Sequence, residues 1–365
     1  MESTPPNTNK TETPLEAQVV EPKPARPAAS PRRKSRMGCL LILLIGGGMS
    51  MLCLVLVGGL GLGSLGGSHH RVREEYFSHK QHFASNKVVI VTLDGVIMSG
   101  DGFVKRQIDC VKDDDSVKAI VFRVDSPGGT VTGSDYIYHY MCQLAKERDI
   151  PVVVSMGAVA ASGGYYVSMV VGDTPDTIFA EPTTWTGSIG VKIPHYDLSK
   201  LLGEIGVADD TIASHRLKTM GSFAKPMTEE ERKIFQGLVN DSFERFKQII
   251  RDGRPEFAKD PKALDVLATG QVYTADQAVK NGLVDKIGFV EDAVDRAIEL
   301  AHLDPDDVKV VKYKPEPTLA GILTGSENRT DAIQMAALLD ATSPRAYYLH
   351  TWLPAALASG YKPEP

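Results

Sequence analysis

The chain has 365 residues, of which 42% are hydrophobic and 24% charged, so it is long enough for one or two globular domains of ordinary composition. Its formal net charge of −6 argues against nucleic acid as the main partner, because phosphate binding usually needs a basic surface. The four cysteines form no CxxC pair and no Cys/His cluster, which excludes the common zinc and thioredoxin-like sites. We interpret Cys110 and Cys142 as ordinary thiols, with a disulfide as the alternative if the domain is exported. No metal or organic cofactor is expected.

An uncharged segment at residues 37–67 predicts a transmembrane anchor. A helix needs roughly 20 apolar residues to cross a hydrocarbon core about 30 Å thick, and this segment is long enough. Four basic residues lie immediately before it, whereas the two arginines after it are offset by two glutamates, so the positive-inside rule places the N-terminus in the cytoplasm. A cleaved signal peptide is the alternative, but the apolar run is longer than usual and no clear A-x-A-like site follows. We therefore expect a single-pass membrane protein whose main domain is extracytoplasmic, and periplasmic if the cell has two membranes.

The composition around this segment divides the rest of the chain. Residues 1–36 are rich in Pro, Thr, Glu and Ala and predict a disordered cytoplasmic tail. Residues 68–86 are assigned to a juxtamembrane linker and residues 87–303 to the folded domain. Residues 304–365 are assigned to a C-terminal extension of unknown role.

From residue 87 the chain alternates short β-branched strands with amphipathic helices, which is typical of an α/β layered domain. Continuous apolar runs such as Val152–Val154 suit strands buried on both faces of a largely parallel sheet. A capping-box-like sequence at Thr228–Glu231 begins a helix that we expect to end near Asp252. The other predicted elements are strands at Val88–Thr92, Ala119–Val124, Val152–Ser155 and Thr177–Ala180, and helices at Phe103–Val111, Ser134–Arg148, Ala275–Asn281 and Val290–Ala301, with one more beginning near Ser162.

A turn of small residues at Gly157–Tyr166 places Ser162 where a buried strand is expected to pass into a helix. Small neighbours permit a tight turn and close approach of a substrate, and the amides at a helix start can stabilise developing negative charge. Nucleophile elbows use the same physics. On this segment alone, the alternative is a small-residue helix that simply packs against the sheet.

A second glycine-rich turn, at Asp125–Gly129, ends the preceding strand. The backbone N–H of Gly128 or Gly129 could donate to the oxyanion of a tetrahedral intermediate, where side chains would obstruct. An ordinary Pro-Gly turn between strand and helix is the alternative. The turn becomes informative because it occurs together with Ser162.

A nucleophilic serine needs a general base. His195 and His215 are the histidines closest in sequence to these turns, but lone histidines are more often surface or core residues. A lysine can replace histidine when burial keeps it neutral near pH 7, and the Ser-Lys pair is a recognised variant of the catalytic triad.

Three motifs occur in the order and spacing of the signal peptide peptidase A family: Ser126–Gly129, Ala161–Tyr166 and Thr186–Val191. The chain therefore resembles peptidase family S49, which belongs to the Clp-protease and crotonase-like superfamily. The resemblance implies an α/β spiral of repeated ββα units, whose members commonly assemble into rings or domes. It covers roughly residues 87–303 and extends to Lys218–Ser222, Pro226–Arg232, Gly270–Thr274 and Gly282–Asp285.

The resemblance implies that Ser162 is the nucleophile and Lys218 the general base. Ser188 would donate or accept a hydrogen bond that holds the lysine in place. In assemblies of this type a neighbouring subunit can complete the dyad. Lys192 and Lys225 are alternative bases, which the register of the motif after Lys218 disfavours.

The resemblance also implies an oxyanion hole made by Gly128 or Gly129 together with the backbone N–H of Gly163. Three positions depart from the family pattern, although none is a catalytic side chain. The extra negative charge of Asp125, beside the oxyanion turn, could slow the reaction or change its pH profile. These departures are Asp125 in place of Asn, Thr219 in place of Asp and Gln271 in place of Arg.

The expected function is hydrolysis of hydrophobic peptides, such as released signal peptides, through an acyl-enzyme on Ser162. The expected partners are such peptides, membrane lipid through the anchor, and further copies of the chain. One alternative is acyl-CoA chemistry on a crotonase-like fold, which an extracytoplasmic location disfavours. The other is a membrane scaffold that has lost activity, with Asp125 and Thr219 as signs of it.

Overall fold

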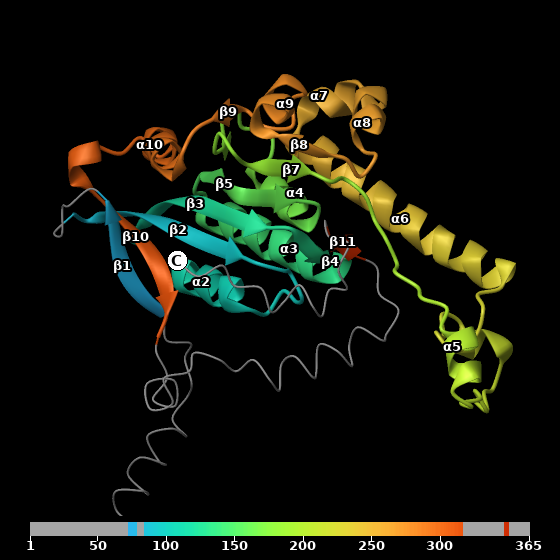
Figure 1. Ribbon diagram of the computed structural model, residues 1–365. Coiled ribbons are helices and arrows are strands. Elements are labelled where there is room, and N and C mark those ends of the chain that lie inside the picture. Colours follow the sequence, from blue (N-terminus) through green and yellow to red (C-terminus); the bar gives the residue numbers. More distant parts are fainter. Residues whose placement is uncertain (1–71, 79–83, 317–346, 350–365) are drawn as a thin grey trace, which may run out of the picture. The chain divides into compact units, whose positions relative to one another are not determined.

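The computed structural model describes residues 72–78, 84–316 and 347–349 (Figure 1). The predicted cytoplasmic tail and the predicted anchor at 37–67 lie outside these residues. Within the described ranges, no helix combines the length and the apolar character needed to span a bilayer.

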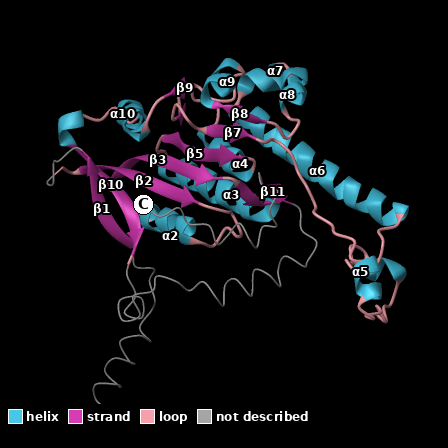
Figure 2. Ribbon diagram, in the orientation of Figure 1, coloured by secondary structure: helices cyan, strands magenta, loops and turns pink. Residues whose placement is uncertain are grey.

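A nine-stranded sheet forms the centre of the described chain (Figure 2). The first pair in the sheet is antiparallel, and the neighbouring strands from β10 to β9 are parallel. Its order is β1 (Val72–Ser78), β10 (Val308–Pro315), β2 (Asn86–Asp94), β3 (Val117–Ser126), β5 (Val152–Ala161), β6 (Ile178–Ala180) and β9 (Lys286–Ile287). The last residues of β5 no longer pair with β6 but with β7 (Trp185–Gly187). Strand β7 in turn pairs antiparallel with β8 (Val272–Thr274).

Apolar side chains on both faces hold this sheet between helices. Alternate residues of the central strands point to opposite faces, so Val89 and Val91 join the larger core while Val88 and Ile90 join the smaller one. Helices α2 (Phe103–Lys112) and α3 (Val131–Arg148) cover the larger core, and α10 (Val290–Leu300) covers the smaller one. Because both faces are buried, the strands read as continuous apolar runs, as the sequence analysis predicted.

The helices predicted near Ser162, after Thr228 and at Ala275 are confirmed, whereas three short helices in the second half of the chain were not predicted. The long helix α6 (Glu229–Gly253) begins with the predicted capping box, in which Thr228 and Glu231 bond each other's backbone N–H groups. Helix α3 begins three residues earlier than predicted, because the Thr130 hydroxyl caps it by accepting from the N–H of Gly133 at 3.0 Å. The shorter helices are α4 (Gly163–Ser168), α5 (Ser199–Glu204), α7 (Pro255–Lys259), α8 (Pro261–Leu267) and α9 (Ala275–Lys280), with 3₁₀ turns at Met169–Val171, Arg216–Thr219 and Pro305–Asp307.

The sheet is larger than the domain predicted for residues 87–303. Strand β1 comes from the segment assigned to a linker, and β10 comes from the segment assigned to a C-terminal extension. Both belong to the same sheet, because β10 pairs with β2 on one side and with β1 on the other. The folded unit therefore extends to residues 72 and 315.

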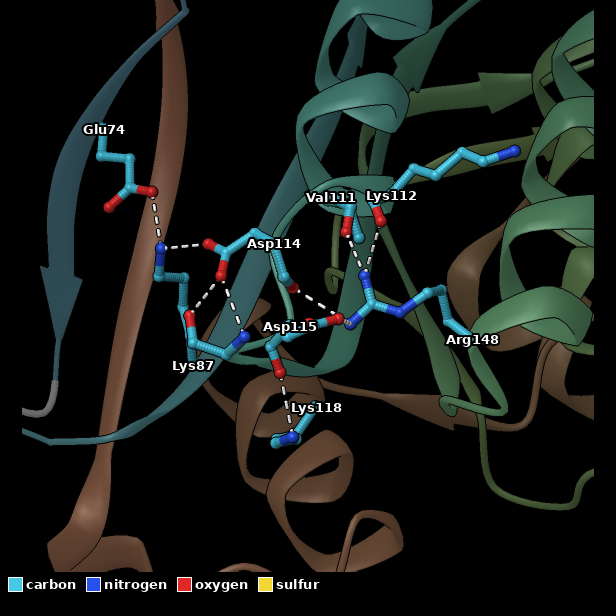
Figure 3. A network of polar contacts seen from close by, with 9 residues as sticks. Glu74, Lys87, Val111, Lys112, Asp114, Asp115, Lys118 and Arg148 are labelled. Carbon is cyan, nitrogen blue, oxygen red and sulfur yellow. Dashed lines mark hydrogen bonds and ion pairs between the residues drawn. The ribbon is translucent and has the colours of Figure 1, made fainter.

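A polar network fastens β1 to the rest of the sheet (Figure 3). The ammonium of Lys87, which is 5% exposed, donates to carboxylate oxygens of Glu74 and Asp114 at 2.6 Å each. Burial lowers the pKa of Lys87, but the bonds to Asp114 and Glu74 outweigh it and hold that pKa above its ordinary value. Arg148 at the end of α3 donates to the carbonyl oxygens of Val111, Lys112 and Asp114, so the loop that carries Asp114 is fixed from both sides.

Candidate active site

Ser162 occupies a strained turn between β5 and α4. Its φ of 55° and ψ of −113° lie in a region that non-glycine residues rarely adopt. The turn is held at both ends, because the N–H of Ser162 donates to the carbonyl of Gly187 at 2.7 Å and its carbonyl accepts from the N–H of Tyr166 at 2.9 Å. A serine on a sharp strand-to-helix turn is the geometry of a nucleophile elbow. The side chain is almost completely enclosed, since Ser162 is 1% exposed.

The second glycine turn lies directly against this elbow. A methyl group at Gly163 would stand 3.1 Å from the Cα of Gly128 and 3.1 Å from the amide nitrogen of Gly129. Gly128 has a φ of +95°, which favours glycine, and a Cβ on Gly129 would collide with the carbonyl of Ile97 at 1.8 Å. The structure therefore brings together the three glycines that the sequence analysis selected. The N–H of Gly128 donates to the Ser126 hydroxyl at 3.1 Å.

Ser188 lies beside Ser162 through the pairing of β5 with β7. Ala161 is opposite Gly187 in that pair, so each serine follows a paired residue. Ser188 has a φ of 50° and is 7% exposed, and its N–H donates to the carbonyl of Gln271 at 2.7 Å. This bond uses the backbone carbonyl of residue 271, so it does not depend on the Gln271 side chain, the one that departs from the family pattern.

Lys218 lies in a different place. It belongs to the 3₁₀ turn Arg216–Thr219 and is exposed. Within the residues that the structure describes, no polar contact joins Lys218 to Ser162. Figure 1 shows why, because the chain after β7 runs away from the sheet to α5 and returns only along α6.

We call residues 192–228 the arm. Several large apolar side chains of the arm are exposed, which is unusual for a segment of a folded monomer. They are Tyr196 (56%), Leu198 (40%), Leu201 (54%), Ile205 (66%), Val207 (51%), Ile212 (99%) and Phe223 (46%).

The alternative bases differ in their surroundings. The Lys225 ammonium pairs with Glu231 at 2.5 Å, inside the capping region of α6. Partial burial lowers the pKa of Lys192, which lies four residues after Ser188. The two histidines have structural contacts: a ring nitrogen of His195 lies 3.3 Å from the carbonyl of Ser222, and His215 accepts from the N–H of Leu217 at 3.2 Å.

A short strand from the C-terminal part of the chain lies along the glycine turn. Strand β11 (Tyr347–Leu349) pairs antiparallel with β4 (Gly128–Thr130), with Tyr348 opposite Gly129. It also contacts α3 and α4. The backbone edge beside the elbow therefore accepts an extended chain.

A cleft of about 680 Å³ opens next to the end of β4. Its walls come from the loop before α2, from the start of α3 and from the first half of α6. Its lining includes Met98, Thr130, Tyr136, Ile193, Phe235 and Leu238. Most of the wall surface is apolar, although Asp101 and Asp241 also line the cleft.

Comparisons with known proteins agree with this geometry. The family model described as peptidase family S49 matches residues 144–304, which contain Ser162, Ser188 and Lys218. A putative protease of Synechocystis is 36% identical over 245 residues, which are 67% of this chain and 84% of that protein. The chain belongs to peptidase family S49.

Other S49 relatives carry protease names. A putative signal peptide peptidase SppA of Enterococcus faecium is 40% identical over 212 residues, 58% of this chain and 59% of that protein. Protease 4 of Salmonella typhi is 34% identical over 281 residues, 74% of this chain and 42% of that protein. The chain thus spans about half the length of these two relatives. The family and these names support a serine peptidase, and the mixed α/β sheet fits a Clp-protease-like S49 fold.

Within the described part of the chain, no three His, Cys, Asp or Glu side chains form a group that could hold a metal ion. The resemblance noted from the motifs is confirmed at the level of the family. The roles of the individual residues remain proposals.

Proposed function

We propose that this S49 chain is a serine endopeptidase that cleaves extended hydrophobic peptides, released signal peptides among them, with Ser162 as nucleophile and Lys218 as general base. The observation that carries the proposal is the strained elbow of Ser162 against the glycine turn, where even a methyl group on Gly163 would lie only 3.1 Å from Gly128 and Gly129. This arrangement supplies a nucleophile and backbone donors within one site.

The proposed reaction has two steps. The Ser162 oxygen attacks the scissile carbonyl while a neutral lysine takes the hydroxyl proton, and the N–H groups of Gly129 and Gly163 stabilise the oxyanion. The C–N bond then breaks as the lysine returns the proton to the leaving amine, which gives an acyl-enzyme. Water, deprotonated by the same lysine, attacks the ester and releases the carboxylate product and the free Ser162 hydroxyl.

We propose that the lysine reaches this serine from a second copy of the chain. Lys218 is exposed on the arm, and so are several apolar side chains of the arm. Ser162, in contrast, is enclosed in the turn that follows β5. If the arm packs against a neighbouring subunit, one contact buries these apolar side chains and desolvates Lys218. A ring of such head-to-tail contacts would give every copy a complete dyad.

Strand β4 could recognise a substrate through main-chain hydrogen bonds. A peptide that adds to β4 as an antiparallel strand, in the way that β11 does, would run past Gly128 and Gly129 toward the elbow. Main-chain hydrogen bonds are independent of sequence, and the adjacent cleft would select an apolar side chain. Both properties suit hydrophobic peptides of varied sequence. The predicted anchor would hold the site near the outer face of the membrane, where such peptides are concentrated.

Complementation between two inactive variants tests the proposal directly. We expect Ser162→Ala and Lys218→Ala to be inactive separately. When both are co-expressed, random assembly of sites in trans should restore roughly a quarter of wild-type peptidase activity. Restored activity would show that each site takes its two residues from different chains. A mixture that stays inactive would reject the contribution in trans, and full activity of either single variant would reject the dyad.

A further inference from the structure

Strand β5 changes neighbour just before it reaches Ser162. Residues Val154–Met156 pair with β6, whereas Val159–Ala161 pair with β7. Between these two runs the register with β3 shifts, because Met156 is opposite Val124 and Ala160 is opposite Ser126. Three residues of β5 therefore stand against the single residue Asp125 of β3. This segment, Gly157–Val159, is a bulge three residues before the nucleophile.

Three side chains hold the backbone at the bulge, two from β3 and one from the loop before β7. Arg123 donates to the carbonyl of Met156 at 3.2 Å, and Thr184 donates to the carbonyl of Gly157 at 2.7 Å. At the end of the bulge, an oxygen of the Asp125 carboxylate accepts from the N–H of Val159 at 3.0 Å. Of these contacts, the one with Asp125 lies nearest to Ser162 along the chain.

The fit between Asp125 and the bulge is close. A methyl group at Gly157 would lie 2.8 Å from the Cγ of Asp125 and 3.0 Å from its second carboxylate oxygen. The carboxylate thus lies over Gly157 while it accepts from the N–H of Val159. This position differs from the one considered in the sequence analysis, in which the charge was expected to act on the oxyanion turn.

We propose that Asp125 is a positioning residue for Ser162, whose carboxylate fixes the bulge at Gly157–Val159 and thereby sets the register in which β5 presents the nucleophile to β7. The contact that follows from this register is the bond from the N–H of Ser162 to the carbonyl of Gly187 at 2.7 Å. The required property is an acceptor atom at the end of a two-carbon side chain. An asparagine at the same position would also supply this acceptor, so the acceptor atom and not the negative charge is the required property.

Three variants of the full-length protein test this inference, which rests on the proposed function. Asp125→Ala removes the acceptor, Asp125→Asn keeps it and removes the charge, and Asp94→Asn removes the charge at the residue opposite Asp125 in β2. We expect Asp125→Ala to lower kcat about 10- to 100-fold with KM within about twofold, because displacement of a reacting atom affects the chemical step. We expect both asparagine variants to stay within about twofold of wild type.

Hydrogen exchange gives a readout that is independent of activity. In Asp125→Ala the Val159 amide should exchange faster than in wild type, whereas in Asp125→Asn it should not. If Asp125→Ala does not fold, Gly157→Ala tests the same contact by pushing the carboxylate off the bulge, and the same loss of kcat is expected.

Different failures have different meanings. Wild-type protein whose Ser162 does not react with a fluorophosphonate would refute the proposed function, and the exchange of Val159 would still decide whether Asp125 holds the bulge. Unchanged exchange or unchanged kcat in Asp125→Ala would overturn the inference. An Asp125→Asn variant as impaired as Asp125→Ala would also overturn it, because the charge and not the acceptor would then matter.

Discussion

Ser162 and Gly187 are joined by a backbone hydrogen bond of 2.7 Å, which links the nucleophile turn to the strand that carries Ser188. The φ angles of Ser162, Gly187 and Ser188 are all positive, at 55°, 82° and 50°. Backbone strain of this kind persists only where the surrounding structure enforces it. The surrounding backbone therefore holds Ser162 and Ser188 in one fixed arrangement.

Substitution of Gly163 should damage catalysis more than stability. In Gly163→Ala the new methyl group would meet Gly128 and Gly129 at 3.1 Å and the Ser134 hydroxyl at 2.5 Å, which moves the proposed oxyanion donors apart. We expect kcat to fall about 10²-fold or more, as when one oxyanion donor is lost. Steady-state kinetics on a peptide measures this. Gly237→Ala on α6 is the matched control, because its methyl group meets nothing within 4 Å; an equal loss there would contradict the prediction.

Charged substitutions on the arm should prevent assembly. Ile212 and Leu201 are 99% and 54% exposed, so Asp at either position costs little in the separate chain but places a charge in the proposed contact between copies. We expect a smaller mass by analytical ultracentrifugation, together with loss of peptidase activity, while the far-UV circular dichroism spectrum stays that of a folded chain. Val266→Asp on α8 is the control, since Val266 is 74% exposed and lies outside the arm. Active protein of reduced mass would contradict the contribution of Lys218 in trans.

Removal of β11 should favour peptide binding. Because Tyr347–Leu349 pair with β4, they compete with any peptide that adds to the same edge. A chain that ends at residue 346 should show a KM several-fold lower with kcat nearly unchanged. A chain that ends at residue 349 keeps β11 and should behave like the full-length protein. Equal KM values for the two truncated chains would show that β11 does not compete with substrate.

Loss of Lys87 should destabilise the edge of the sheet. In Lys87→Met the half-buried carboxylate of Asp114 loses its partner, and we expect the free energy of unfolding to fall by about 1–3 kcal/mol at neutral pH. Urea denaturation measures this difference. Lys118→Met is the control, because Lys118 is exposed and donates only to the carbonyl of Asp115 among the described contacts, so a change below about 0.5 kcal/mol is expected.

The same pair has a defined pH dependence. Burial raises the pKa of Asp114, but bonds from Lys87 and Ser116 outweigh it and hold that pKa below its ordinary value of 3.8. A carboxylate with a lowered pKa stabilises the fold above its ordinary pKa and loses this contribution as pH falls through the lowered value. For Lys87, whose pKa is raised above 10.5, the contribution is lost as pH rises through the raised value. The difference between wild type and Lys87→Met should therefore be constant near neutrality and shrink at both extremes.

Local patterns predicted most of the central elements. The apolar runs predicted the parallel strands β2, β3 and β5, because strands buried on both faces have few polar positions. The capping box predicted the first turn of α6. Strand β10 was missed, although Val308, Val310 and Val311 alternate with lysines in a pattern typical of a strand. Polar residues flank this strand and it follows the last recognised motif, so residues 308–315 were assigned to a C-terminal extension instead of the sheet.

Long-range contacts could not be predicted in the same way. The bond from Val159 to Asp125, the approach of Gly163 to Gly128, and the pairing of Tyr348 with Gly129 all join residues whose proximity depends on sheet order and register. The motif resemblance selected Ser162 and Lys218 together, but it contained no information on whether one chain holds both. In the structure they belong to different regions.

The position of β10 has a consequence for synthesis of the protein. Strand β1 pairs with β10, which lies between β1 and β2. It therefore cannot enter the sheet until residues 308–315 have left the ribosome. The strands that pair with β5, the strand before Ser162, are β3, β6 and β7, and all of them end by residue 187. During synthesis, the edge formed by β10 and β1 therefore joins the sheet after the strands that carry the nucleophile turn.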